Sequence, residues 1–191
     1  FANILGDMGF ASLTLDQRNF GAIDTQRDLQ MFLQGKEPIE HKMVYDALAA
    51  AKILRDQPGI DPDRIVYLGE SNGGRFAIIA CGLDPKACGI IGISTSGYGT
   101  GAAIASGRLS KPNMIQFYKS IDPETYVYEI PPRKLVMFHS LNDPIIPFQY
   151  ANSTYSLALK PKELHTVNCS LHGHCEEMEE ILKKEIRWMI S

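Results

Sequence analysis

A strand-like run, a Gly-x-Ser-x-Gly turn and a helix-like run follow one another between Arg64 and Cys81, and this succession constrains the fold more than any other feature. The run Arg64–Leu68 is apolar without polar alternation, which is typical of a strand buried on both faces. The segment Gly74–Cys81 continues as an apolar helix. Units of this kind build parallel sheets that are covered by helices.

The rest of the chain repeats the alternation. Further strands are predicted at Phe10–Leu15, Gly89–Ser94, Lys134–His139 and, more weakly, Leu164–Asn168. Amphipathic helices are predicted at Ile39–Arg55 and Glu176–Ile190. We therefore expect an α/β fold, a mostly parallel sheet with helices on both faces.

The chain of 191 residues contains no internal repeat or low-complexity segment, and we expect residues 1–191 to form a single domain. Between two predicted strands lies a longer insertion, Gly97–Arg133, which is rich in tyrosine, phenylalanine, methionine and isoleucine. Such a segment could form a cap over a site, because apolar side chains on an excursion from the sheet need something to cover. An ordinary crossover helix is the equal alternative.

Charge and hydropathy exclude several classes of function. The chain has 19 Lys and Arg against 22 Asp and Glu, a net charge of -3, and no basic run that could bind nucleic acid. No apolar run reaches the roughly 18 residues of a membrane span, and the opening residues FANILGDMGF lack the pattern of a signal peptide. We expect a soluble, cytoplasmic protein that binds neither nucleic acid nor a membrane.

The four cysteines are too few and too irregular for a disulfide scaffold, so we expect them to be reduced, with a Cys169–Cys175 bridge as the alternative. The segment CSLHGHC also offers four zinc ligands within seven residues. Adjacent His174 and Cys175 would have difficulty converging on one tetrahedral ion. We therefore expect no metal and no other cofactor.

The turn itself, GESNGGR, raises the question of whether Ser71 is a nucleophile or a helix cap. Glycines two residues to either side, Gly69 and Gly73, leave room for the neighbouring strand and helix when the serine is held in a strained conformation. The serine then sits at a helix N-terminus, which favours developing negative charge. The alternative is an N-cap, the commonest role of a serine before a helix.

A nucleophilic serine needs a base, and the base needs an acid that orients it. Asp143 directly follows the Lys134–His139 strand and should emerge at the same sheet edge as Ser71, although Asn-Asp-Pro is also a common turn. Two histidines stand in the loop before the last helix. We prefer His174, which opens that helix, and keep His172, closer to the strand, as the alternative.

These motifs together resemble the α/β-hydrolase superfamily over nearly the whole chain. The resemblance rests on the loop DQRNFG, the turn GESNGGR, the acid loop SLNDPIIP and the histidine loop LHGH. It implies Ser71 as nucleophile, His174 as base and Asp143 as orienting acid. It also implies the backbone N–H of Asn72 as one donor of the oxyanion hole.

The pair Gly73-Gly74 is similar to turns in the prolyl oligopeptidase and the acetyl-ester or dienelactone hydrolase branches. Because no propeller domain is evident, a serine hydrolase that cleaves a small ester through an acyl-enzyme is the leading prediction. One alternative is a peptidase or thioesterase with the same triad. The other is a non-catalytic, hydrolase-like binding subunit.

The N-terminus departs from the family. Residues 1–13 resemble the end of the family's first helix and its fourth strand, which would leave out the first three strands and the loop that usually supplies the second oxyanion donor. A hole would then lie between the Phe10–Leu15 and Arg64–Leu68 strands, with unpaired backbone groups on each side. We therefore expect an upstream polypeptide or a partner chain to supply the missing strands.

Overall fold

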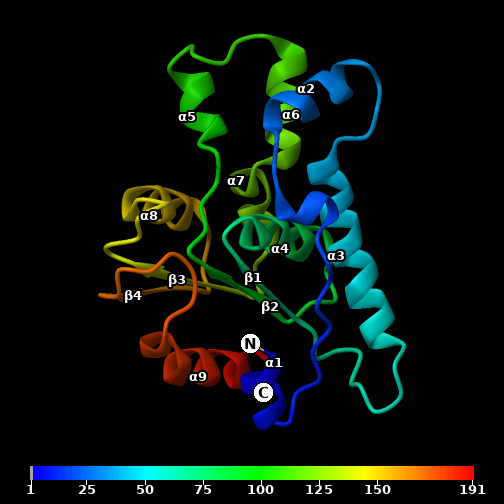
Figure 1. The fold of residues 1–191 in the computed structure, drawn as a ribbon, viewed down its shortest axis with the longest axis vertical. Helices are drawn as coiled ribbons and strands as arrows, with labels where there is room; N and C mark the ends of the chain where they lie inside the picture. Colours follow the sequence, from blue (N-terminus) through cyan, green and yellow to red (C-terminus); the bar gives the residue numbers. More distant parts are fainter. Residues whose placement is uncertain (1) are drawn as a thin grey trace.

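Four parallel strands form the centre of the molecule in the computed structural model, which describes residues 2–191 apart from the side chain of Asn19. The strands are β1 (Val66–Glu70), β2 (Gly89–Ile93), β3 (Lys134–Ser140) and β4 (Lys162–Val167). They lie side by side in chain order, with Val66 opposite Gly89, Gly89 opposite Lys134 and Leu135 opposite Lys162 (Figure 1). Every residue of β2 and β3 is buried, as expected of inner parallel strands.

Helices cover both faces of this sheet, which confirms the expected α/β class (Figure 1). The α-helices are α1 (Ala2–Asp7), α2 (Thr25–Leu33), α3 (Ile39–Arg55), α4 (Asn72–Leu83), α5 (Thr100–Ala105), α6 (Pro112–Ile121), α7 (Pro123–Tyr126), α8 (Phe148–Leu157) and α9 (Glu179–Met189). Short 3-10 helices are η1 (Arg18–Gly21), η2 (Val127–Glu129) and η3 (Glu176–Met178). One core cluster joins α3, α4 and α8 to the sheet, and a second joins α9 and α1 to its other face.

The helices follow from the spacing of apolar residues. The predicted helix Ile39–Arg55 is α3, with Met43, Val44 and Ala51 buried against α4. The predicted last helix divides into η3 and α9, and its apolar stripe packs on the sheet through Leu182 and Ile186. None of the helices within residues 2–191 is both long and apolar enough to cross a bilayer.

The insertion Gly97–Arg133 forms α5, α6, α7 and η2. Its last part belongs to the domain core, because Val127 and Ile130 are almost fully buried and lie in the cluster that contains α4. Its first part stands with α2 at one end of the molecule (Figure 1). A cap over a site remains a prediction for that first part.

The prediction of a strand at Phe10–Leu15 is wrong. These residues form an irregular segment that runs past β1 without pairing with it, and Leu13 and Leu15 are 43% and 39% exposed. A strand is stabilised by hydrogen bonds to a neighbouring strand, and the part of the chain that the structure describes places none beside this segment. Residue pattern alone could therefore not make it a strand.

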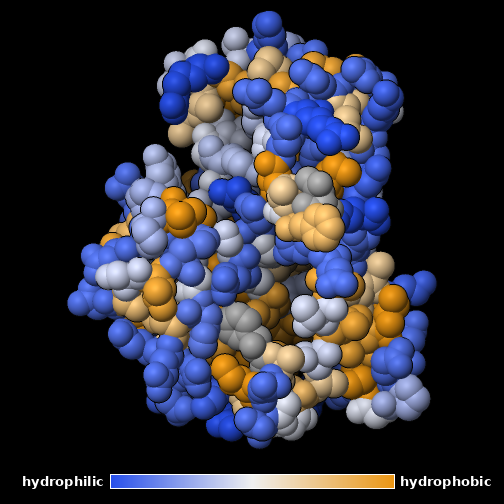
Figure 2. Space-filling view, viewed as in Figure 1, coloured by the Kyte–Doolittle hydropathy of each residue, from blue (hydrophilic) through white to orange (hydrophobic). Residues whose placement is uncertain are grey.

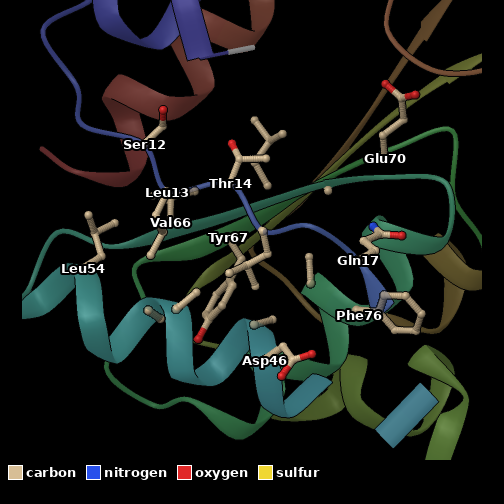
Figure 3. Close-up of a pocket in the computed structure, with 18 of the residues that line it drawn as sticks. Ser12, Leu13, Thr14, Gln17, Asp46, Leu54, Val66, Tyr67, Glu70 and Phe76 are labelled. Atoms are coloured by element: carbon tan, nitrogen blue, oxygen red, sulfur yellow. The ribbon is translucent and has the colours of Figure 1, made fainter. Parts of the chain in front are cut away.

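A cavity of about 520 Å³ separates this segment from β1, where the sequence predicted a hole. Figure 2 shows an apolar hollow on this side of the molecule. Figure 3 shows Leu13 and Thr14 of the passing segment across from Val66 and Tyr67 of β1, with Leu54 on α3 beside them.

The backbone of β1 is unpaired along the cavity. The carbonyl of Ile65 accepts from Cys88 and the N–H of Ser71 donates to Ile93, so the odd-numbered residues bond towards β2. In a parallel strand the alternate residues direct their N–H and C=O groups to the other side. The groups of Val66, Leu68 and Glu70 therefore face the cavity, and no strand formed by residues 2–191 pairs with them.

Candidate active site

Ser71 occupies a sharp turn between β1 and α4, with φ 54° and ψ -120°. The turn requires Gly69, because a Cβ there would lie 2.2 Å from the carbonyl oxygen of Gly73. At Gly73 a Cβ would lie 3.3 Å from Nε2 of Gln17, a tight but softer contact. The side chain of Ser71 makes no cap hydrogen bond to α4, so the hydroxyl is left for another partner.

That partner is His172. Its Nε2 lies 2.8 Å from Oγ of Ser71, and its Nδ1 lies 3.0 Å from both carboxylate oxygens of Asp143. The three side chains come from the turn after β1, the loop after β3 and the loop after β4, which all leave the same edge of the sheet. This chain of contacts can pass a proton from the hydroxyl to the imidazole while the carboxylate holds the ring.

The expectation that His174 would be the histidine beside Ser71 is wrong. The backbone N–H of His174 donates to Oε2 of Glu70 at 3.0 Å, and its Nε2 lies 3.9 Å from Oε1 of Glu179. His172 and not His174 faces Ser71 because Gly173, with a φ of +99°, turns the chain between the two histidines. A Cβ on Gly173 would meet the carboxylate of Glu70 at 2.4 Å, so this turn is packed directly against the serine loop.

Asp143 is held as a carboxylate. Its Oδ1 accepts from the N–H groups of Ile145 and Ile146 at 2.8 and 2.9 Å, and its side chain is fully buried. Burial alone would raise the pKa of Asp143, but hydrogen bonds from Ile146, Ile145, His172 and Ser94 outweigh burial and hold this pKa below its ordinary value. A negative charge next to Nδ1 favours the ring orientation in which Nε2 faces the serine.

Two further side chains reach this arrangement, and sequence reasoning missed both. His139 is buried and its Nε2 lies 3.7 Å from Oδ2 of Asp143 and 2.8 Å from the carbonyl of Ile146. Burial lowers the pKa of His139, which keeps its ring neutral next to Asp143. Ser94, at the end of β2, bonds to the histidine loop through Gly173. In the sequence, His139 and Ser94 are each a single polar residue at the end of a strand. Such residues are too common to indicate a site.

The expected oxyanion donor, Asn72, is the first residue of α4, where a backbone N–H has no acceptor within its own helix. Its side chain is held aside, because Oδ1 accepts from Nη1 of Arg75 at 3.1 Å. The same guanidinium stacks over the ring of Tyr98 and donates to the carbonyl of Ser96. The turn is thus braced on the side of α4 as well as on the side of the histidine.

The candidate zinc ligands of the CSLHGHC loop do not meet in a metal site. Across the described part of the chain, His, Cys, Asp and Glu side chains form no group of three that could hold an ion. Both ring nitrogens of His172 already face Asp143 and Ser71. All four cysteines are free, so the alternative of a Cys169–Cys175 bridge is not realised.

Known proteins share this fold and sequence pattern. The chain is 27% identical over 151 residues to the uncharacterized protein YfhR of Escherichia coli O157:H7, and the match covers 78% of this chain and 52% of that protein. The YfhR protein of E. coli strain K12 matches to the same extent. The chain therefore spans about half the length of the curated relatives it matches.

Two esterases of known structure have the same fold. Acetyl xylan esterase 1 from Thermoanaerobacterium sp. JW/SL YS485 superposes with a TM-score of 0.66 at 15% identity, over 95% of this chain and 60% of that one. Acetyl xylan esterase from Paenibacillus sp. R4 also gives 0.66, at 17% identity, over 80% of this chain and 54% of the other. The model of the acetyl xylan esterase (AXE1) family matches residues 29–142, which include the Ser71 turn and end one residue before Asp143. With an α/β-hydrolase sheet and this match over more than half of its length, the chain belongs to the acetyl xylan esterase (AXE1) family.

Proposed function

We propose that this protein is a serine hydrolase that cleaves a carboxylic ester of a small substrate, with a short acyl group such as acetate. The observation that carries the proposal is the position of His172, within 2.8 Å of Ser71 and 3.0 Å of Asp143. Membership of the acetyl xylan esterase family supports the ester bond and the short acyl group. The alcohol component is selected by a pocket and not by the triad.

The reaction proceeds in two halves. Oγ of Ser71 attacks the ester carbonyl while Nε2 of His172 takes the hydroxyl proton, and the new oxyanion faces the N–H of Asn72. The carbon–oxygen bond to the alcohol then breaks, and the alcohol leaves with the proton from His172. Water loses a proton to His172 as it attacks the acyl-serine, and the acid and free Ser71 are released. Asp143 stays ionised and stabilises the imidazolium.

A fluorophosphonate probe tests this proposal directly, because it reacts with an activated serine. We expect the label on Ser71, and we expect Ser71→Ala to abolish both labelling and hydrolysis of p-nitrophenyl acetate without loss of fold. Ser96→Ala is a matched control, since it removes a nearby buried hydroxyl and keeps the backbone carbonyl that accepts from Arg75. Retained turnover in Ser71→Ala would reject the mechanism.

The alternative of a non-catalytic binding subunit keeps one supporting observation, the open cavity next to the Ser71 turn. No labelling of the wild-type protein, together with a stable stoichiometric partner, would favour it. A peptidase or thioesterase would label in the same way, and profiling across esters, thioesters and aminoacyl amides separates these from an esterase.

We further propose that an extended segment of an upstream polypeptide lies along β1. Its support is the row of unpaired backbone groups on Val66, Leu68 and Glu70, which face an apolar cavity. Such a strand would bond to these groups and bury Val66 and Leu68. If the protein from its native source has an intact mass of 21.2 kDa and no second polypeptide co-purifies, this proposal is wrong.

A further inference from the structure

The end of β2 contacts all three parts of the site, although none of its side chains is in the triad. The strand lies between β1, which leads to Ser71, and β3, which leads to Asp143. The carbonyl of Ile93 accepts from the N–H of Ser71 at 2.9 Å, and the N–H of Ser94 donates to Phe138 on β3 at 2.9 Å. These two backbone hydrogen bonds continue the pairing of β2 with β1 and with β3 to the residues that directly follow β1 and β2.

Side chains then continue the contacts beyond the sheet. Oγ1 of Thr95 donates to the carbonyl of Ser71 at 2.8 Å, so the nucleophile is held at both its N–H and its C=O. Oγ of Ser94 accepts from the N–H of Gly173 at 2.9 Å, one residue after His172. Two adjacent hydroxyls thus hold the nucleophile on one side and the base on the other.

Ser94 also affects the ionisation of Asp143. Burial is the largest influence on the pKa of Asp143 and raises it. The opposing hydrogen bonds, first those from the N–H groups of Ile146 and Ile145 and last that of Ser94, hold this pKa below its ordinary value. The same hydroxyl donates to the carbonyl of Gly173 at 3.4 Å.

The backbone of Ser94 indicates that this hydroxyl is needed. Ser94 has φ +46° and is fully buried. Glycine and asparagine adopt this left-handed conformation more readily than serine does, so the backbone alone does not favour a serine here. Strained residues of this kind persist where surrounding contacts hold them, and they cluster at functional sites.

We propose that Ser94 and Thr95 are positioning residues that set the separation between the hydroxyl of Ser71 and the imidazole of His172. Neither touches the reacting atoms. Ser94 holds the loop of His172 against the acid, and Thr95 holds the backbone of Ser71. This inference rests on the proposed hydrolase function, and it adds the residues that keep its nucleophile and base at hydrogen-bond distance.

The test compares Ser94→Gly, Ser94→Ala and Thr95→Val with the wild type and with Ser96→Ala, in the protein as isolated with any co-purifying polypeptide. Glycine removes the hydroxyl and fits the positive φ, so Ser94→Gly should fold. We expect kcat for p-nitrophenyl acetate to fall about 10- to 100-fold in all three variants, with KM within about twofold, because a misplaced base slows only the chemical step. Ser96→Ala should keep wild-type values.

A pH profile separates positioning from a purely structural role. Loss of the Ser94 donor leaves the Asp143 carboxylate more basic, so the Asp143–His172 pair binds its proton more tightly. The acid limb of kcat/KM should therefore move to higher pH by about half a unit or more in Ser94→Gly. Thr95→Val, which removes the hydrogen bond to the carbonyl of Ser71, should leave that limb in place.

Proton NMR gives a readout that does not depend on turnover. The low-field resonance of the Nδ1–H between His172 and Asp143 should shift or broaden in Ser94→Gly and stay unchanged in Ser96→Ala. Wild-type kcat and an unchanged resonance in folded Ser94→Gly would overturn the inference, and so would loss of folding in both Ser94 variants. If the wild-type protein neither labels nor hydrolyses esters, the proposed function fails, while the resonance still decides whether Ser94 positions the pair.

Discussion

The position of His172 leads to a prediction that distinguishes two histidines only two residues apart. Replacing His172 with glutamine removes the acceptor 2.8 Å from the Ser71 hydroxyl and leaves a side chain of similar size that cannot take a proton. Loss of a triad base lowers kcat by about 10⁴- to 10⁶-fold. At about 1.4 kcal/mol for each factor of ten, this corresponds to a transition state destabilised by about 5.5 to 8 kcal/mol.

His174→Gln is the matched control. The bond from residue 174 to Glu70 is made by the backbone N–H, so it survives the substitution. The imidazole faces Glu179 across 3.9 Å, a distance at which a partly exposed pair contributes at most about 1 kcal/mol. We expect kcat within about threefold of the wild type.

The assay is steady-state hydrolysis of p-nitrophenyl acetate by both variants, with circular dichroism as a check on folding. Activity should be lost in His172→Gln and kept in His174→Gln. The opposite outcome, full activity without His172 and none without His174, would refute the assignment of the base. Equal and small effects in both would mean that neither imidazole takes the serine proton.

Three further predictions follow from single contacts. Asp143→Asn should lower kcat by about 10³- to 10⁴-fold with the fold intact, because an amide cannot hold the imidazole in its required tautomer; unchanged kinetics would contradict this. In Gly74→Ala the new Cβ would lie 2.7 Å from the side chain of Thr95, so we expect urea unfolding to show a loss of about 1–3 kcal/mol, and an unchanged midpoint would count against the packing argument. Burial opposes ionisation of Asp84, but hydrogen bonds led by Arg55 hold its pKa below its ordinary value. Its stabilisation is therefore complete above about pH 4 and is lost as pH falls through the folded pKa, so Asp84→Asn should lose less stability on acidification than the wild type.

The strand-turn-helix unit around Ser71 could be predicted from sequence because its signals are local. An apolar run, two glycines at fixed spacing and a second apolar run each act on their immediate neighbours. β1 forms two residues later than the predicted strand, and α4 extends the predicted helix by two residues at each end. The same holds for α3, whose bounds follow the spacing of its apolar residues. Asp143 was also predictable, because the carboxyl ends of parallel strands meet at one sheet edge.

The segment Phe10–Leu15 shows where local pattern fails. Its residues suit a strand, but a strand also requires a partner to receive its backbone bonds, and β1 lies across a cavity from it. Pairing depends on what occupies the space between two segments, and that space is a property of the tertiary structure.

By itself the sequence determined the α/β class, the turn that presents Ser71 and the acid loop, because these depend on contacts within a few residues or on the common direction of parallel strands. Only the tertiary structure decided between His172 and His174. Both lie in one loop of ordinary composition, and the turn at Gly173, packed against Glu70 and Ser94 from distant parts of the chain, directs one imidazole to the serine and the other away. The position of a side chain in such a loop is set by its neighbours in space, and the sequence does not show which residues those are.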